Sequence, residues 1–208
     1  SIHRYEPERG IVEFLVRRKG QGTVWLGNRR PGEMLDLIGP LGRGFSLVKG
    51  KALLVGGGIG VAPLLSLAET LHKGGASPVT LLGAGSARDL LRVAEFERAS
   101  QVVKISTLDG SAGRQGLVTA LLQEELEQGF DGFIYTCGPE PMLEAVAALA
   151  GQYGLKGEAS LEANMACGIG VCLGCTCRIY GKQGETYAHV CTDGPVFPLE
   201  VVKGYVRN

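Results

Sequence analysis

Four cysteines in the last quarter of the chain constrain its fold more than any other feature. They follow the spacing C-x4-C-x2-C, and fifteen further residues separate the third from the fourth. This opening spacing is that of a plant-type [2Fe–2S] cluster, which four thiolates hold. Three glycines between the first and third cysteines allow backbone angles in which amides point toward a negatively charged cluster. The predicted cluster ligands are Cys167, Cys172, Cys175 and Cys191.

Three other roles compete for these cysteines. A zinc ribbon would usually pair two C-x2-C knuckles, and only one such knuckle is present here. A disulfide framework is typical of small secreted domains, and no signal peptide is visible in this longer chain. Four buried structural cysteines would match this spacing only by accident. The iron–sulfur interpretation is therefore favoured, with Cys177 as a spare apolar residue packed on a strand.

Size and charge exclude several classes of function. The chain has 208 residues, enough for one large or two small domains. Its formal net charge is zero, which argues against nucleic acid as the main partner. No apolar run is long enough to span a membrane. Six cysteines, four of them with a metal role, fit the reducing cytoplasm, where we expect the protein to act.

Residues 1–48 read as about six short β elements separated by turns. Ile11–Arg17 alternates apolar and polar residues, an amphipathic stretch opens at Thr23–Leu26, and Met34–Ile38 reads as a further strand. These elements suggest a sheet or barrel that is too short to close alone. Amides and a hydroxyl at Gly22-Thr23 could meet a phosphate, but taken alone that pair reads as an ordinary hairpin turn.

Residues 51–153 alternate buried strands with helices. This pattern predicts a parallel sheet covered on both faces, which is a nucleotide-binding architecture with ligands at the carboxyl ends of the strands. The expected strands are 51–58, 78–83, 102–107 and 133–137. The expected helices are 59–73, 89–99, 117–128 and 141–153.

Two of these strands end in glycine-rich turns that each open a helix. The first, GGGIGVAP at Gly56–Pro63, does not match the dinucleotide fingerprint G-x-G-x-x-G, but it offers bare amides and a helix N-terminus to a pyrophosphate. The second is TCGPEPML at Thr136–Leu143. Together they predict a cleft for an extended ligand, while Cys137 alone would read as a small buried residue.

Residues 158–208 carry the cysteines. Thr176–Tyr180 and Thr186–Val190 read as a hairpin joined at Gly181–Gly184. A module of this size has too little core of its own and would depend on its metal for stability.

Taken together, GGGIGVAP, TCGPEPML and MACGIGVCLGC…VCTDGPVF resemble one family over the whole chain. It is the electron-transfer subunit of class B, NAD-dependent dihydroorotate dehydrogenase, a branch of the ferredoxin–NADP reductase superfamily. The resemblance implies an α/β plus β protein of three domains. These are a flavin-binding β-barrel without its N-terminal half (1–48), a doubly wound NAD-binding domain (49–157) and a small [2Fe–2S] domain (158–208).

The resemblance also assigns residues to cofactors. Ser1 matches the serine of the family's R-P-x-S flavin motif, Cys137 would lie near the nicotinamide as the catalytic residue, and Asp109 lies in a loop beside the nucleotide. The same four cysteines match the cluster ligands. The other residues implied to contact FAD are Leu15, Val16, Arg17, Gly22 and Thr23. Those implied to contact NAD are Gly57, Gly58, Gly60, Gly138 and Pro139.

The implied mechanism is electron transfer. A partner subunit would oxidise dihydroorotate on its own FMN, and electrons would pass singly through the cluster to FAD and in pairs, as hydride, to NAD. The family pairs two of these chains with two catalytic subunits in a heterotetramer. Two alternatives remain open: a subunit of another flavin and iron–sulfur NAD(P)H oxidoreductase, of the ferredoxin or sulfide dehydrogenase type, or a cluster-bearing binding module without turnover.

Overall fold

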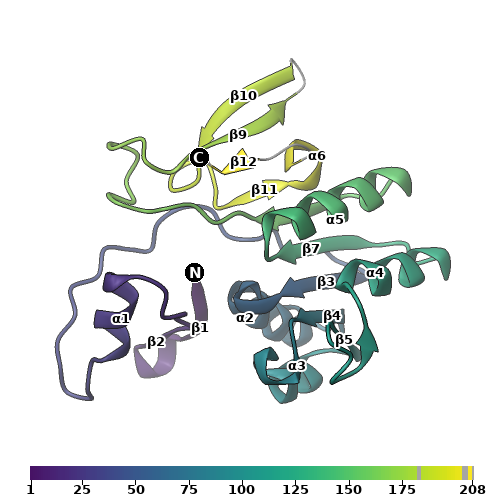
Figure 1. Cartoon of the computed structure of the whole chain (residues 1–208), viewed down its shortest axis with the longest axis horizontal. Helices are drawn as coiled ribbons and strands as arrows, with labels where there is room; N and C mark the ends of the chain where they lie inside the picture. Colours follow the sequence, from purple (N-terminus) through teal and green to yellow (C-terminus); the bar gives the residue numbers. More distant parts are fainter. Residues whose placement is uncertain (182–183, 203–205, 208) are drawn as a thin grey trace.

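The computed structural model describes residues 1–181, 184–202 and 206–207. Its centre is a seven-stranded sheet in the order β11-β8-β7-β3-β4-β5-β6, in which β11 alone is antiparallel to its neighbour (Figure 1). The strands are β3 (Ala52–Gly57), β4 (Val79–Ala84), β5 (Val102–Thr107), β6 (Arg114–Gln115), β7 (Phe133–Cys137), β8 (Gly157–Ser160) and β11 (Val196–Pro198).

Helices cover both faces of this sheet, as the sequence predicts. Every residue of β3 is buried, and its side chains alternate between two cores. Leu54 packs with α2 (Val61–Lys73) and α3 (Val93–Ala99) on one face. Leu53 packs with α4 (Val118–Glu127) and α5 (Glu140–Gln152) on the other. The predicted parallel sheet with two covered faces is thus confirmed.

The N-terminal segment, residues 1–48, differs from the prediction. It contains a two-stranded hairpin of β1 (Ile2–Glu6) and β2 (Ile11–Phe14), a 3-10 turn at Pro7–Arg9, and the helix α1 (Gln21–Gly27). The expectation of about six β elements is wrong for these residues. Met34–Ile38 has no strand pairing despite its alternating pattern, and Met34 is 93% exposed. No neighbouring strand in the described chain offers it a hydrogen-bonding edge.

The C-terminal part forms a second small sheet beside the first. β9 (Thr176–Gly181) pairs with β10 (Gly184–His189) and with β12 (Val206–Arg207), and α6 (Leu199–Val202) follows β11. The predicted hairpin is confirmed, although residues 182 and 183 of its connection lie outside the described residues. Cys177 is fully buried on β9, as expected for a spare apolar residue.

The end of the N-terminal segment, residues 43–48, is called the linker here, and it is hydrogen-bonded to the large sheet and to the turn that precedes β11. The Arg43 amide donates to the Gly194 carbonyl at 2.7 Å, beside the cysteine region. The amide and hydroxyl of Ser46 both donate to the Glu158 carboxylate, at 2.8 and 2.7 Å. The Tyr135 hydroxyl donates to the Ser46 carbonyl at 2.7 Å. Among the described residues, no helix is both long enough and apolar enough to cross a bilayer.

Candidate functional site

The two glycine-rich turns meet where the strand order of the large sheet reverses. β3 and β7 are neighbours, and the chain continues from β3 toward β4 but from β7 toward β8. Such a switch point opens a crevice at the carboxyl ends of parallel strands, where ligands bind in open α/β sheets. The predicted turns at Gly58–Gly60 and Gly138-Pro139 lie on either side of this point.

These turns approach each other so closely that side chains would not fit between them. A Cβ at Gly60 would lie 2.4 Å from the Cys137 carbonyl oxygen, and one at Gly57 would lie 2.9 Å from Pro139 Cδ. Gly58 is different, because it has a φ of +54° and a Cβ there would meet open space. Its backbone is therefore bare toward the cleft, as a nucleotide cradle requires.

The opposite wall of the cleft comes from the N-terminal segment. The cleft has a volume of about 650 Å³, within the range of small-molecule and cofactor sites. Of the residues implied to contact FAD or NAD, its lining includes Leu15, Val16, Arg17, Thr23, Gly57, Gly58, Gly60, Gly138 and Pro139. The structure thus brings the flavin-side and NAD-side candidates to one place.

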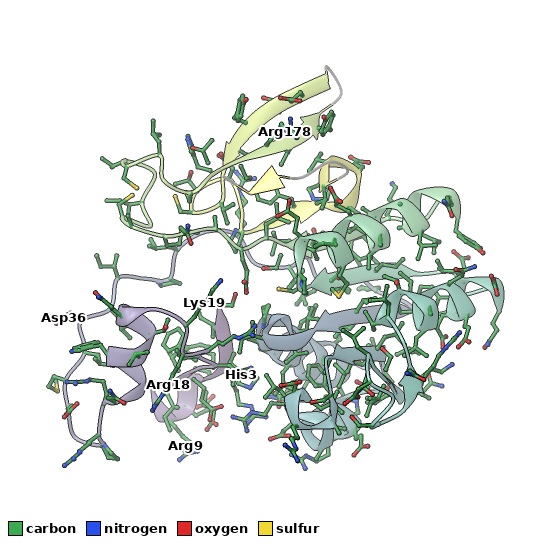
Figure 2. The ribbon with its side chains drawn as sticks, viewed as in Figure 1. His3, Arg9, Arg18, Lys19, Asp36 and Arg178 are labelled. Carbon is green, nitrogen blue, oxygen red and sulfur yellow. The ribbon has the colours of Figure 1, made fainter. Side chains whose placement is uncertain are left out.

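Several residues that line the cleft are not among the site residues predicted from the sequence. Lys19 stands beside Arg17 on the N-terminal wall, and Glu140 and Glu162 lie across the cleft. Figure 2 shows Lys19 on the part of the N-terminal segment that faces the rest of the molecule. The run RRKG at 17–20 was the available signal, since consecutive cations before a glycine suit an anionic ligand. Two cations on this wall fit the phosphates of a flavin or nicotinamide dinucleotide.

Thr23 is fixed by the turn that precedes α1. Its hydroxyl oxygen accepts hydrogen bonds from the amides of Lys19 and Gly20, at 2.9 and 3.1 Å. Gly22 lies next to it in the first turn of α1, outside the lining of the cleft. The predicted hairpin turn at Gly22-Thr23 is therefore wrong, because these residues begin a helix.

Three other candidates lie outside the cleft lining. Ser1 is exposed at the start of β1. The Asp109 carboxylate accepts from the Ser111 amide and hydroxyl, at 2.9 and 2.6 Å, and these bonds lower its pKa. Cys137 is fully buried, and burial raises its pKa to about 12 against a hydrogen bond from Ser160. Its thiol packs beneath the cleft, so contact with a nicotinamide stays a prediction.

The cysteine loop supplies hydrogen-bond donors to its own sulfur atoms. The amides of Ile169 and Cys172 donate to Cys167 Sγ at 3.5 and 3.4 Å, and the Gly174 amide donates to Cys172 Sγ at 3.4 Å. The amide hydrogen bonds to Cys167 Sγ lower the pKa of this thiol to about 6, and the bond from the Cys172 amide contributes more to this shift than the bond from the Ile169 amide. A thiolate is the form that ligates metal, so this loop favours the ligand state.

The four cysteines fall into two pairs. Cys167 and Cys172 are hydrogen-bonded to each other, and Cys175 Sγ and Cys191 Sγ lie 3.1 Å apart. The hydrogen bond that this second pair shares keeps the proton on Cys191 and raises its pKa. All four are free thiols. Across the described chain, no group of three or more His, Cys, Asp or Glu side chains is placed to hold one metal ion. Two pairs of thiols suit a binuclear cluster, in which the protein ligands divide between two irons.

Comparison with known protein families agrees with both sites. Residues 162–203 match the family model described as the iron–sulfur cluster binding domain of dihydroorotate dehydrogenase B. Residues 54–148 match the oxidoreductase NAD-binding domain. The first match contains the four cysteines, and the second contains both glycine-rich turns.

Individual relatives extend the likeness to nearly the whole chain. A dihydroorotate dehydrogenase B (NAD(+)) electron transfer subunit from Caldanaerobacter subterraneus subsp. tengcongensis is 40% identical over 203 residues, which cover 97% of this chain and 78% of the relative. The protein of the same name from Shouchella clausii is 41% identical over 207 residues, with the same coverage.

Solved structures show the same fold. An NADH-dependent reduced ferredoxin–NADP oxidoreductase, described for flavin-based electron bifurcation, superposes with a TM-score of 0.85 at 31% identity, covering 97% of this chain and 72% of that one. A cytochrome b5 reductase domain of Ulva prolifera nitrate reductase, at 19% identity and a TM-score of 0.53 over 65% of this chain, shares the fold alone.

The predicted fold class is confirmed: a ferredoxin–NADP reductase-like fold with a parallel nucleotide-binding sheet and a C-terminal iron–sulfur domain. The described residues form no closed barrel. With 40% identity to relatives of which it covers more than three quarters, the chain belongs to the family of dihydroorotate dehydrogenase B (NAD(+)) electron transfer subunits.

Proposed function

We propose that this protein carries electrons from dihydroorotate oxidation, in a partner subunit that holds FMN, to NAD+ in the cytoplasm. The cluster and FAD are its resident cofactors, and NAD binds in the cleft. When bound, the cluster exchanges single electrons and the flavin converts pairs of them into a hydride for NAD. Residues 1–48, 49–157 and 158–208 serve as the flavin, NAD and cluster parts.

One observation carries the proposal: the cleft and the cysteine loop are adjacent in the chain. Glu162 lines the cleft, and Cys167 follows five residues later. A stretch of that length spans at most about 18 Å even when fully extended. The two cofactor sites are therefore close neighbours, as a path from cluster to flavin needs.

The roles of the chain's residues are positioning and electrostatic. Arg17 and Lys19 are proposed to hold cofactor phosphates, and the Gly58 backbone to admit the dinucleotide. Amides of the cysteine loop stabilise negative charge on the sulfurs, which is a means of tuning a cluster potential. Asp109, Gly22 and Ser1 are proposed as peripheral contacts, and the Cys137 thiol as a group at the nicotinamide end.

The proposed partner contact lies over the cysteine loop. This loop exposes four large apolar side chains, a feature that marks protein interaction sites. They are Met165, Ile169, Val171 and Leu173, between 51% and 75% exposed. An electron donor docked there would lie directly against the cluster. We propose the FMN subunit as that donor, in a heterotetramer of two plus two.

A second candidate is a ferredoxin-dependent NAD(P)H oxidoreductase subunit, and the superposition with the reduced ferredoxin–NADP oxidoreductase favours it. One experiment separates the two. The loaded protein is mixed with the purified FMN subunit and dihydroorotate, and NADH formation is followed; reduced ferredoxin replaces both in a parallel assay. We expect NADH with dihydroorotate only. Turnover with ferredoxin alone would overturn the proposal, and the Cys191→Ser variant serves as the inactive control.

A further inference from the structure

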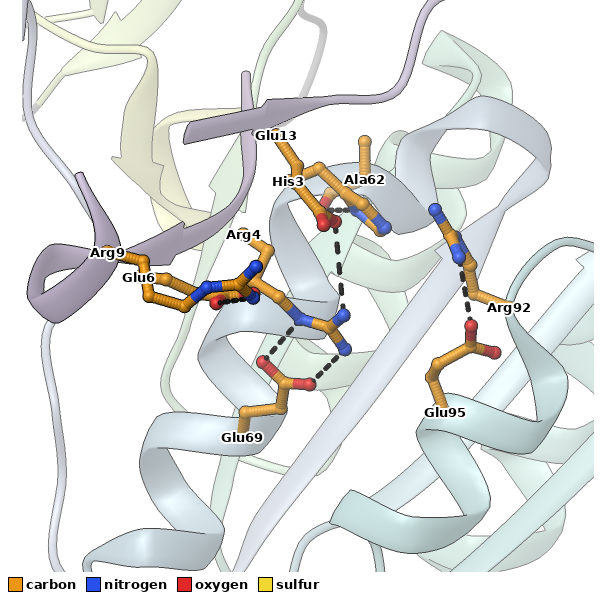
Figure 3. A network of polar contacts seen from close by, with 9 residues as sticks. All are labelled: His3, Arg4, Glu6, Arg9, Glu13, Ala62, Glu69, Arg92 and Glu95. Atoms are coloured by element: carbon orange, nitrogen blue, oxygen red, sulfur yellow. Dashed lines mark hydrogen bonds and ion pairs between the residues drawn. The ribbon is translucent and has the colours of Figure 1, made fainter. Parts of the chain in front are cut away.

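The N-terminal hairpin is attached to the large sheet by a small set of polar contacts on α2. His3 Nδ1 is hydrogen-bonded to the Ala62 carbonyl oxygen at 2.8 Å. Arg4 makes a two-point contact with Glu69, with Nε and Nη2 at 3.2 and 2.5 Å from its two carboxylate oxygens. Figure 3 shows both contacts side by side. We call His3, Arg4 and Glu69 the hairpin clamp.

The hairpin clamp differs from the other ion pairs drawn with it. Arg9 pairs with Glu6 inside the hairpin's own connection, and Arg92 pairs with Glu95 at the start of α3. Neither of those pairs joins two parts of the molecule. The Arg4–Glu69 pair joins residues 65 positions apart, and each side chain is only about one quarter exposed. Planar two-point pairing of this kind fixes orientation as well as distance.

The surroundings of Arg4 reinforce its contact with α2. Glu13 of β2 lies 3.9 Å from Arg4 Nη1, so the same guanidinium also joins the two strands of the hairpin. The hydrogen bond to Glu69 raises the pKa of Arg4 above its usual value. His3 is 1% exposed, and its Nε2 has no hydrogen-bond partner among the described residues. The ring is therefore held in the interface by a single polar contact and by packing.

Both sides of the hairpin clamp lead directly into the walls of the cleft. β2 ends at Phe14, and the next three residues, Leu15–Arg17, line the cleft on the flavin side. α2 begins at Val61, directly after Gly60, which lines it on the NAD side. The bond to the Ala62 carbonyl is two residues from Gly60. A shift of the hairpin along α2 would therefore change the separation of the two walls.

We propose that Arg4, with His3 and Glu69, is a positioning residue that sets the separation between the flavin wall and the nicotinamide wall of the cleft. This rests on the proposed function, in which a hydride, carrying two electrons and one proton, passes between NADH and the flavin there. The rate of such a transfer depends steeply on geometry: a misplacement of about 1 Å caused far from the chemistry can cost about 100-fold.

The test compares variants of the full chain loaded with FAD and cluster. Arg4→Gln and Glu69→Gln each remove the charge pair, Arg4→Lys keeps the charge without the planar fork, and the Arg4→Glu, Glu69→Arg double variant reverses the pair. Arg9→Gln is the matched control, because it removes an ion pair from the same hairpin without touching α2. Anaerobic stopped-flow absorbance gives the rate of flavin reduction by NADH, and calorimetry gives the Kd of NAD. Amide hydrogen exchange reports residues 15–19 and 57–60 independently of activity.

Arg4→Gln and Glu69→Gln are expected to slow flavin reduction about 10-fold or more, with Kd changed less than about twofold. Exchange should rise in both cleft segments. The rate of flavin reduction in Arg4→Lys should lie between the rates of wild type and Arg4→Gln. The variant with the reversed pair should regain part of the lost rate, and Arg9→Gln should reduce the flavin at the wild-type rate. Wild-type rates in Arg4→Gln and Glu69→Gln, or equal losses in Arg9→Gln, overturn the proposal. If wild type itself transfers no hydride, it is the proposed function that fails. If Arg4→Gln does not fold, Arg4→Lys and the reversed pair decide.

Discussion

The six thiols of this chain differ in what surrounds each sulfur atom. Cys167 receives amide hydrogen bonds, and its pKa falls to about 6. Cys137 and Cys177 are fully buried, and burial raises their pKa values to about 12 and about 11. Hydrogen bonds to sulfur favour the thiolate, whereas burial among apolar groups favours the thiol. The local environment thus separates a proposed ligand from cysteines that pack as core residues.

Replacing a proposed ligand should remove the cluster, and replacing a core cysteine should not. Cys167→Ser is expected to lose nearly all iron and the reduced EPR signal. Cys177→Ala should keep both, at a stability cost of about 1 kcal/mol for a small cavity. Iron analysis and EPR of anaerobically purified protein measure the difference. Iron retained in Cys167→Ser and lost in Cys177→Ala would contradict the assignment.

Burial of Cys137 predicts an unreactive thiol. Its pKa in the folded chain is about 12, so at pH 8 the thiolate fraction is about a thousandfold below that of a thiol with a pKa near 9. Because folding raises this pKa, the resulting stability is present below pH about 9 and is lost as pH rises toward 12. Mass spectrometry after iodoacetamide treatment should show Cys137 alkylated only in unfolded protein. Rapid labelling of the native protein would instead place the thiol in the cleft.

Gly60 tests the close contact of the two glycine-rich turns. A Cβ there would meet the Cys137 carbonyl at 2.4 Å, so Gly60→Ala must push the turns apart. We expect a stability loss of about 2 kcal/mol or more and weaker NAD binding. Gly151→Ala is the control, since its Cβ meets open space on α5 and the change should stabilise that helix by roughly 0.5–1 kcal/mol. Denaturant unfolding measures the stability of the two variants, and calorimetry measures their NAD binding. Wild-type stability and NAD affinity in Gly60→Ala would show that the turns are not in contact.

At the scale of elements, the buried parallel strands could be predicted and the N-terminal segment could not. β3 and β7 read directly from the sequence because strands covered on both faces are continuous apolar runs. α1 is a seven-residue helix with two glycines, too short for a helical period to stand out. Met34–Ile38 alternates like a strand, but alternation does not say whether a partner strand exists.

The residues of the candidate site, like the elements of the fold, could be predicted only in part from the sequence. Glycine turns and cysteine spacing leave motifs in the sequence, so most of the cleft lining could be named. Glu162 and the Arg4–Glu69 pair could not, because a charged residue becomes part of a site only through contacts between distant positions. Cys137 was assigned by resemblance, and its burial depends on packing that no local pattern encodes.

The linker offers a test at this scale. Tyr135 on β7 donates its hydroxyl proton to the Ser46 carbonyl and accepts from the Val48 amide at 3.3 Å. Tyr135→Phe leaves both backbone groups without this partner and should cost about 1–3 kcal/mol of unfolding free energy. Tyr153→Phe, at the exposed end of α5, should change it by less than about 0.5 kcal/mol. Equal urea midpoints for the two variants would show that the linker contact contributes nothing.

At the scale of the whole molecule, three features lie along one route. The exposed apolar side chains of the cysteine loop face outward, and the four thiols lie in that loop and in the turn that follows β10. The cleft begins five residues before the first thiol. The N-terminal segment closes the cleft through the hairpin clamp and the linker. Electrons entering at the loop would therefore reach the cleft without leaving this chain.

The most direct test is an anaerobic titration of the purified, loaded protein with NADH, followed by absorbance and EPR together, with iron and flavin quantified beforehand. About two irons and one FAD per chain are expected. NADH should bleach the flavin and produce the EPR signal of a reduced [2Fe–2S] cluster, because the flavin passes electrons on singly. Zinc in place of iron, or a flavin that is reduced while the cluster stays oxidised at every NADH concentration, would contradict electron transfer through this chain.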